Sequence, residues 1–386
     1  MFSSRTTWDR TENQLTSLLR VKRRSGAAVL DLTDSNPTRA GIPRPADLLA
    51  SLAGPESLVY DPEPRGLLPA REAVAADYRR RGLDVSPDQL VLTASTSEAY
   101  SLAFRILCDP GDAILVPRPS YPLLDFLATL ESVTLERYPL AYDGVWHLDD
   151  SALAARVTPA TRAIVVVNPN NPTGSFLKRD EADRLLDFCA ARQLAMIVDE
   201  VFADYPFGAD SRRLTAFDGG DRALVLAFGG LSKSCGLPQL KLGWIAVSGP
   251  ARLRDEALAR LEIVADTYLS VGTPVQRAAP RLLARTRELQ QPISDRLAAN
   301  LGELRRQLAG TSSATLLEVE GGWSAVLRVP ATISEEERVC RLLERRDVLV
   351  HPGYFFDFDA EAYVVLSLLV AEETFAVGVQ RLLADL

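Results

Sequence analysis

The chain has 386 residues, and 43 lysines and arginines against 51 aspartates and glutamates give a formal net charge of −8. No apolar run approaches the roughly 18–20 residues of a membrane span, the first residues lack the apolar core of a secretory signal, and the acidic balance disfavours nucleic acid as the main partner. Four scattered cysteines predict a reducing, cytoplasmic setting, and two histidines leave little material for a His-based metal site or a Ser-His-Asp relay, so we expect no metal site. If the chain is an enzyme, we expect its reactive centre to use other groups.

Short apolar runs alternate with amphipathic stretches between about residues 90 and 250. We expect strands at 90–93, 113–116, 133–138, 163–167, 195–198, 223–228 and 244–247. Helices are predicted between them at 97–107, 121–130 and 178–192. The apolar runs are rich in β-branched residues and nearly continuous, which is typical of strands buried on both faces. This region is therefore predicted to be an α/β domain with a mostly parallel, doubly covered sheet.

The pattern changes after residue 250. Long helical patterns at 251–265 and 274–309 come first. Strands are then expected at 315–319, 325–329, 348–350 and 363–369, with helices at 334–346 and 372–386. No Gly- or Ser-rich linker separates the two regions. We expect a smaller α+β domain here.

Polar residues follow three strands of the predicted sheet. The segment 168–174, rich in Asn and Pro, follows the strand at 163–167, Asp199 follows the next strand, and Lys233 follows the one after. Taken singly they have ordinary interpretations: a turn, a helix cap and a solvated surface charge. The carboxyl ends of parallel strands, however, are where α/β sheets bind ligands. A desolvated lysine there loses its proton easily and can form a Schiff base.

Further segments accompany these sites in a fixed order: Tyr60 with Gly66, 93–99, 110–112, 119–122, 171–174, 199–201, 232–233 with Gly236, and 243–244. The ordered set resembles the fold-type I, pyridoxal-phosphate-dependent aminotransferases of class I/II across nearly the whole chain. The resemblance implies ping-pong transfer of an amino group between an amino acid and a 2-oxo acid through a lysine Schiff base. It also implies a large domain over 41–275 that binds pyridoxal phosphate, and a discontinuous small domain of 1–40 and 276–386.

The resemblance assigns roles to individual residues. Lys233 would hold the cofactor and move the proton at the substrate α-carbon. Asp199 would pair with the pyridinium nitrogen, Asn171 would donate to the phenolic oxygen, and Tyr121 would stack on the ring. Phosphate contacts are implied for Ser95, Thr96, Ser232 and Lys241. Tyr60 would reach the phosphate of the neighbouring subunit, which implies a homodimer with shared sites.

Several positions depart from the family pattern. Ser95, Gly230 and Lys241 replace a glycine, a serine and an arginine near the phosphate. Phe202 stands where the family usually has a tyrosine whose hydroxyl donates to the cofactor. Val365 aligns with the arginine that clamps the substrate α-carboxylate, a loss of about 1.5–3 kcal/mol or more if nothing replaces it. Arg39 and Tyr354 are candidate substrate contacts, and we assign catalysis to neither histidine.

These departures keep other functions open. The scaffold could serve a lyase, decarboxylase or racemase, or an aminotransferase whose substrate lacks a free α-carboxylate. A non-enzymatic sensing module is a further alternative, although residues 1–40 are too short for a winged helix with a linker. A nicotinamide-dependent oxidoreductase is disfavoured because no G-x-G-x-x-G follows the first strand.

Overall fold

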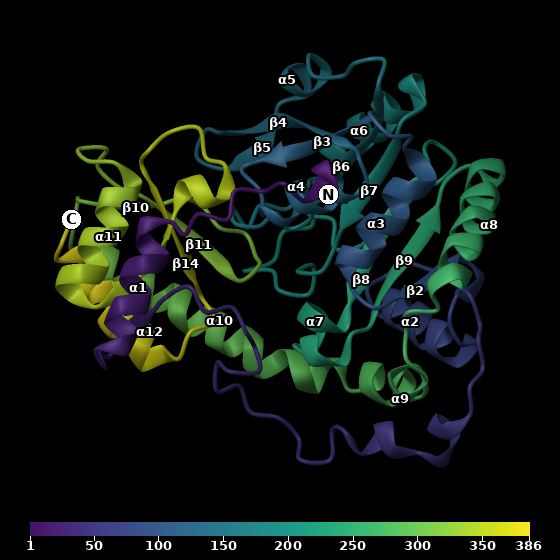
Figure 1. Ribbon diagram of the computed structural model, residues 1–386, viewed down its shortest axis with the longest axis horizontal. Helices are drawn as coiled ribbons and strands as arrows, with labels where there is room; N and C mark the ends of the chain where they lie inside the picture. Colours follow the sequence, from purple (N-terminus) through teal and green to yellow (C-terminus); the bar gives the residue numbers. More distant parts are fainter.

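The computed structural model describes all residues from 1 to 386, and its centre is an eight-stranded sheet (Figure 1). Its strands are β2 (Leu90–Thr93), β3 (Ala113–Arg118), β4 (Thr134–Tyr142), β5 (Trp146–Leu148), β6 (Thr161–Val167), β7 (Ala195–Asp199), β8 (Val225–Gly230) and β9 (Gly243–Ser248). They lie in the order β2-β9-β8-β7-β6-β3-β4-β5. The five strands from β8 to β4 in this order are parallel, whereas β9, β2 and β5 pair antiparallel at the two edges.

Helices cover both faces of this sheet. One face carries α3 (Thr96–Leu107), α4 (Leu123–Leu130) and α8 (Ala251–Tyr268), and the other carries α2 (Leu68–Arg80), α6 (Arg179–Arg192) and α9 (Thr273–Ala284). Successive strand residues alternate between the two hydrophobic clusters, so that Ile197 packs toward α3 while Met196 and Val198 pack toward α2 and α6. Because both faces are covered, the central strands β7 and β8 are nearly continuously apolar, as the sequence predicted, whereas β4 near the edge contains Glu136 and Arg137.

A smaller unit of strands and helices lies beside the large sheet (Figure 1). Its antiparallel sheet has the order β10-β11-β14-β13, and a separate parallel pair joins β1 to β12. The strands are β1 (Leu30–Asp31), β10 (Thr315–Leu316), β11 (Ser324–Arg328), β12 (Val348–Leu349), β13 (His351–Pro352) and β14 (Tyr363–Ser367). The helices are α1 (Gln14–Arg24), α10 (Thr286–Leu308), α11 (Glu335–Arg346) and α12 (Glu372–Leu383). Segments from both ends of the chain therefore build one unit.

Shorter helices complete the chain. They are α5 (Asp150–Ala154), α7 (Leu231–Ser234) and the 3-10 turns η1 (Ser4–Thr6), η2 (Ala50–Ala53), η3 (Pro55–Leu58), η4 (Pro87–Gln89), η5 (Pro238–Leu240) and η6 (Gly353–Phe356). None of the helices combines the length with the hydropathy that crossing a membrane requires.

Two segments bear on where the units meet. The buried side chains of α9 pack in the core of the large sheet, and that core continues to Leu289, whereas Ile293 belongs to the core of the small unit. At the other end, η1 packs against α4, and Trp8 contacts Phe126 at 5.3 Å between ring centroids. The boundary at residue 275 stays a prediction, and we propose that the chain changes unit within α10, which runs from one unit to the other (Figure 1).

Candidate active site

A cavity of about 400 Å³ lies where the carboxyl ends of β6, β7 and β8 face the small unit. Eight of the predicted site residues line it: Ser95, Thr96, Tyr121, Asn171, Asp199, Ser232, Lys233 and Lys241. The small unit and the N-terminal segment add Thr33, Ser35, Trp323, Ser324, His351 and Val365 to the lining. The strand-end residues that are separate in sequence are thus brought to one cavity, as the parallel sheet predicts.

Lys233 lies on a single helical turn, α7, that follows β8 directly. The strand ends in two glycines because Trp244 of β9 packs closely there: a Cβ added at Gly229 would lie 2.5 Å from the Trp244 Nε1 atom. The backbone of the turn is held by Tyr205, whose buried hydroxyl donates to the carbonyl of Lys233 at 2.7 Å. These contacts fix the position from which the lysine side chain enters the cavity.

The lysine amine is largely buried, and its accessible part faces the cavity. Its Nζ makes no hydrogen bond and lies 5.0 Å from the ring centroid of Trp323 and 5.5 Å from that of Phe202. Burial lowers the pKa of the Lys233 amine, and the charge of Asp199 opposes this shift. A larger share of the amine is therefore neutral than on a surface lysine, and a neutral amine is a nucleophile.

Asp199 ends β7 on the face of the sheet that α3 covers. Its Oδ2 accepts a hydrogen bond from the Tyr100 hydroxyl at 3.1 Å, and its Oδ1 accepts one from the Val201 amide at 3.2 Å. Burial raises the pKa of the Asp199 carboxyl to about 6, although both hydrogen bonds and the nearby Lys233 lower it. Because burial penalises the ionised form, a cation placed in the cavity beside this carboxylate would be strongly favoured.

Asn171 belongs to the loop that follows β6. Its Oδ1 accepts a hydrogen bond from the Ser324 hydroxyl of the small unit at 3.3 Å, while its Nδ2 donates to no protein group. The loop turns at Gly174, which has a φ of 72°, and a Cβ at that residue would lie 2.5 Å from the carbonyl oxygen of Gly321. The amide N–H of Asn171 is therefore available to a ligand in the cavity.

The start of α3 forms a site suited to an anion. Ser95 is the N-cap, and its hydroxyl oxygen accepts from the Glu98 amide at 3.2 Å, which leaves its O–H free to donate. Thr96 is the first residue of this helix of 12 residues. The helix N-terminus provides unpaired N–H groups and a positive dipole end, and Ser232 and Lys241 line the same cavity.

A buried ion cluster supports the loop that follows Asp199. Glu200 points to the opposite side of the sheet, where its Oε2 lies 3.4 Å from Nη1 of Arg81. Arg81 also lies 3.6 Å from Asp77, and its guanidinium stacks over Tyr78 at 4.3 Å. Burial raises the pKa of Glu200 to about 7, and Arg81 opposes the shift. The cluster joins the end of α2 to the loop after β7.

The sequence did not point to two aromatic residues of this site. Tyr100 lies on α3, within a helix that was predicted, but the face of that helix that meets Asp199 depends on how α3 packs on the sheet. Trp323 precedes β11 and packs against Phe202 at 5.4 Å between ring centroids. The two glycines before Trp323 were the only local sequence feature that could have marked it as a site residue, and a glycine pair alone indicates only a turn.

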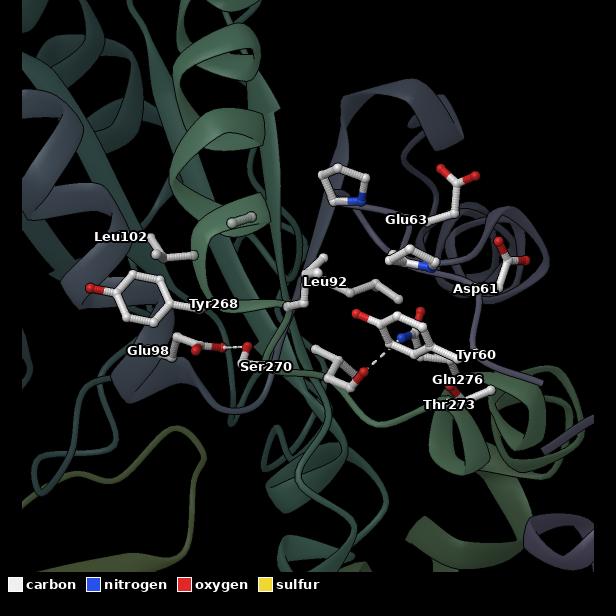
Figure 2. Close-up of a pocket in the computed structure, with 16 residues that line it drawn as sticks. Tyr60, Asp61, Glu63, Leu92, Glu98, Leu102, Tyr268, Ser270, Thr273 and Gln276 are labelled. Atoms are coloured by element: carbon white, nitrogen blue, oxygen red, sulfur yellow. Dashed lines mark hydrogen bonds between the residues drawn. The ribbon is translucent and has the colours of Figure 1, made fainter. Parts of the chain in front are cut away.

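Three predicted site residues lie elsewhere. Tyr60 is 74% exposed and lines a separate, shallow pocket with Thr273 and Gln276 of α9 (Figure 2). Arg39 and Tyr354 are exposed and do not line the cavity. Their roles as substrate contacts stay predictions that the geometry of this chain does not support.

Known proteins share the sequence pattern of this chain. The family "Aminotransferase class I and II" matches residues 37–382. A glutamate-pyruvate aminotransferase of Escherichia coli strain K12 is 29% identical over 256 residues, or 66% of this chain and 63% of the relative, which is less than two thirds of its length. An alanine aminotransferase of Mycobacterium tuberculosis strain H37Rv is 26% identical over 369 residues, or 92% of this chain and 85% of the relative.

Solved structures share the fold. Alanine aminotransferase from Pyrococcus furiosus has a TM-score of 0.87 at 23% identity, with 99% of this chain and 98% of that chain covered. N-succinyldiaminopimelate aminotransferase from Mycobacterium tuberculosis has a TM-score of 0.84 at 25% identity, with 100% of both chains covered. The likeness to the Pyrococcus enzyme establishes the fold alone. It confirms the predicted fold-type I architecture.

Proposed function

The chain belongs to the class I and II aminotransferases, and we propose that it transfers an amino group between an amino acid and a 2-oxo acid in two ping-pong half-reactions with pyridoxal phosphate. Members of this family depend on that cofactor. The observation that supports the proposal best is the amine of Lys233, which is largely buried, lacks a hydrogen bond and shares a cavity with Asp199. The names of the relatives make alanine, glutamate and pyruvate the first substrates to test.

The donor set of the cavity fits pyridoxal phosphate. An amine, a buried carboxylate, a free amide N–H and a helix N-terminus match the aldehyde, the basic ring nitrogen, the phenolic oxygen and the phosphate of the cofactor. When bound, the cofactor supplies an aldehyde that condenses with amines and a ring that withdraws electrons from the substrate α-carbon. Asp199 would hold the ring nitrogen protonated, and the positive nitrogen would in turn lower the pKa of the carboxyl.

The remaining contacts would orient the ring. Asn171 would donate its Nδ2 hydrogen to the phenolic oxygen, and Tyr121, which is 50% exposed at the cavity, would cover one ring face. The phosphate would lie at the N-terminus of α3, with Ser95, Thr96, Ser232 and Lys241 as further contacts. Lys241 offers a point charge and not a bidentate fork, so it adds electrostatic attraction more than orientation.

The proton transfers would be carried out by Lys233. As a neutral amine, its Nζ would take the proton from the substrate α-carbon and hold it for return within the same half-reaction. The lowered pKa of the Lys233 amine suits this task, because the base must be unprotonated near neutral pH. Trp323 and Phe202 flank the amine and cover part of it.

The trapping of Lys233 tests this function. The chain has four lysines, Lys22, Lys178, Lys233 and Lys241, and two of them line the cavity. Borohydride reduction of the holoenzyme should attach the cofactor to the Lys233 peptide, as mass spectrometry would show. Attachment to Lys241 or to no lysine would contradict the proposal. Incubation with L-alanine and no acceptor should convert the cofactor to its aminated form, which separates a transaminase from a lyase, decarboxylase or racemase.

The functional unit is proposed to be a homodimer in a reducing, cytoplasmic setting. The segment before Tyr60 exposes apolar side chains: Leu58 is 89% and Val59 is 58% exposed. A second copy that covers this segment would bring Tyr60 to the phosphate end of the partner's site. The four cysteines are free thiols, which supports the compartment.

Mixed dimers test the sharing of sites. If Tyr60 acts across the interface, mixing Lys233→Ala with Tyr60→Phe subunits produces one intact site per mixed dimer, so cofactor affinity and turnover recover to wild-type values at that site. If Tyr60 acts within its own subunit, no site of the mixed dimer is intact. Light scattering on the same samples measures the oligomeric state.

A further inference from the structure

The cavity has few positive charges. Lys233 and Lys241 line it from the large unit, and His351 is the basic residue that the small unit contributes. No arginine lines the cavity, although all but four of the chain's 43 lysines and arginines are arginines. The proposed function uses Lys233 as the reactive amine and Lys241 at the phosphate end. On the opposite wall, a substrate anion therefore meets His351.

His351 presents its ring to the cavity from a strand. It lies on β13, directly opposite Val365 of β14 in an antiparallel pair, and both residues line the cavity. Residues that oppose each other in such a pair have their side chains on the same face. The imidazole packs against Phe355 and Phe356, with ring centroids 5.8 and 5.7 Å apart. Neither ring nitrogen hydrogen-bonds to a protein group, so the half-buried imidazole has its polar atoms free.

Few charges act on this ring from the elements around it. Asp31 of β1 is the carboxylate that acts on it, and burial nevertheless lowers the pKa of the imidazole. The strand β14 has no charged side chain, and η6 has only Tyr354 as a titratable group. On α11, the carboxylate of Glu335 accepts the amides of Tyr354 and Tyr363 at 2.7 and 2.8 Å. Lys233, Lys241 and Asp199 face the ring only across the cavity.

We propose that His351 binds the carboxylate of the amino acid and 2-oxo acid substrates, a proposal that rests on the proposed function. A ring nitrogen of the imidazolium donates to the carboxylate. The imidazole lies beside the apolar side chain of Val365, on the neighbouring strand and the same face of the sheet. The small-unit side of the cavity has one basic residue, His351, so it neutralises one carboxylate of the substrate. His351 is thus a substrate-binding residue, and the proton transfers remain with Lys233.

The proposal predicts a proton uptake on binding. Without a ligand, the imidazole is mostly neutral near pH 7, since burial disfavours its charged form. A bound carboxylate favours the imidazolium and raises the pKa of the ring, so substrate binding is strongest at low pH and weakens as pH rises through the pKa of the bound state. KM should therefore rise with pH, in contrast to kcat, which follows Lys233.

Histidine NMR tests the contact without catalysis. The chain has two histidines, His147 on β5 and His351, so holoenzyme labelled at histidine Cε1 shows two imidazole signals, assigned by His351→Gln. Propionate, a carboxylate that carries no amino group and cannot react, should raise the titration midpoint of the His351 signal by about one pH unit or more and leave that of His147 unchanged. An unmoved His351 signal, or a shift confined to His147, would overturn the proposal.

Kinetics of matched variants provide the second readout. His351→Gln should raise KM for L-alanine about 10- to 100-fold, the effect of losing a charge-assisted hydrogen bond. Its KM should no longer depend on pH, kcat should change less than about threefold, and His351→Lys should recover part of the binding without the pH dependence. His147→Gln should match the wild type. An unchanged KM in His351→Gln overturns the proposal.

Borohydride trapping on the same preparations separates the two proposals. If the cofactor is trapped on Lys233 and KM is unchanged in His351→Gln, the binding proposal fails while the proposed function stands. Failure to trap on Lys233 rejects the function, and the NMR titration then still decides whether His351 binds a carboxylate.

Discussion

The two walls of the cavity are built in different ways. On the large-unit wall, Asn171, Asp199 and Lys233 lie at or just beyond the carboxyl ends of three adjacent parallel strands. On the small-unit wall, Trp323 directly precedes β11, and His351 and Val365 lie on β13 and β14 of the antiparallel sheet. The first wall has a buried carboxylate with two hydrogen bonds and two lysine amines, whereas the second is mostly aromatic and apolar, with one imidazole whose nitrogens are free.

The difference indicates a division of labour. The groups that match the cofactor lie on the wall whose geometry is set by one sheet, so their relative positions are rigid. The groups left for the substrate lie on the small unit. There, a change such as Val365 in place of the family's arginine alters the charge of the cavity without disturbing the large sheet. Variants of the large-unit wall should therefore affect chemistry and cofactor binding, and variants of the small-unit wall should affect KM.

The largest effect is expected at Lys233. Lys233→Ala should lower turnover by about 10⁴-fold, because the general base is lost, while the fold and binding of the phosphate end persist. A coupled assay with L-alanine and 2-oxoglutarate measures the rate. Lys22→Ala, on α1 and outside the cavity, is the control and should match the wild type. A turnover within tenfold of the wild type in Lys233→Ala would show that the base lies elsewhere.

The next largest effect is expected in the buried ion cluster around Arg81, which packs beneath the large-unit wall. Arg81→Ala should lower the free energy of unfolding by about 3–5 kcal/mol, because it leaves the buried carboxylate of Glu200 without a counter-ion, whereas Asp77 keeps Arg80 at 2.8 Å. Arg79→Ala removes an exposed guanidinium from the same helix and should cost less than about 1 kcal/mol. Urea unfolding of the cofactor-free proteins measures both. Equal losses would mean that the buried cluster does not stabilise the wall.

A pH dependence should distinguish the buried Asp199. Its pKa is about 6 in the folded protein against an ordinary 3.8, so the folded state binds the proton more tightly than the unfolded chain. The contribution to stability is therefore present below about pH 4 and is lost as pH rises to about 6. Between pH 4 and 7, cofactor-free wild type should lose about 2–3 kcal/mol more than Asp199→Asn. Parallel curves for the two proteins would show that the carboxyl is not perturbed.

The smallest effect is expected at Tyr100. Tyr100→Phe removes the hydroxyl that donates to Asp199 and should weaken cofactor binding by about fivefold, or about 1 kcal/mol. Tyr138→Phe is the matched control, since its buried hydroxyl donates to the Val165 carbonyl at 2.7 Å and makes no hydrogen bond to Asp199. It should lower stability and leave cofactor affinity unchanged. Equal cofactor affinities in the two variants would remove Tyr100 from the site.

Particular residues show how far the sequence could lead. Lys233, Asp199 and Asn171 were predictable because each follows an apolar strand, and parallel strands end at one edge. Tyr354 was a candidate because it lies in the segment that follows His351, but η6 turns Phe356 toward the cavity and leaves Tyr354 exposed. The conformation of this short turn decides which aromatic side chain lines the cavity, and no local sequence pattern encodes that choice.

Arg39 illustrates the same limit in the N-terminal segment. Thr33 and Ser35 line the cavity, whereas Arg39 is exposed a few residues later. Arg44 holds this segment through hydrogen bonds to the carbonyls of Cys235 and Gly236 at 2.9 and 2.7 Å. Such contacts between distant residues depend on the packed units, so the pattern of the segment alone could not show which of its side chains face the site.

By itself, the sequence determined the parallel sheet, its double cover of helices and the strand-end residues of the large-unit wall, because apolar periodicity and strand direction are local properties of the chain. The tertiary structure alone decided that Tyr100 meets Asp199, that Trp323 flanks Lys233 and that His351 faces the cavity opposite Val365. These contacts join segments that are far apart in the chain, and packing between helices and sheets sets their geometry. The charge missing at Val365 was visible in the sequence, but the imidazole opposite it became visible only in the fold.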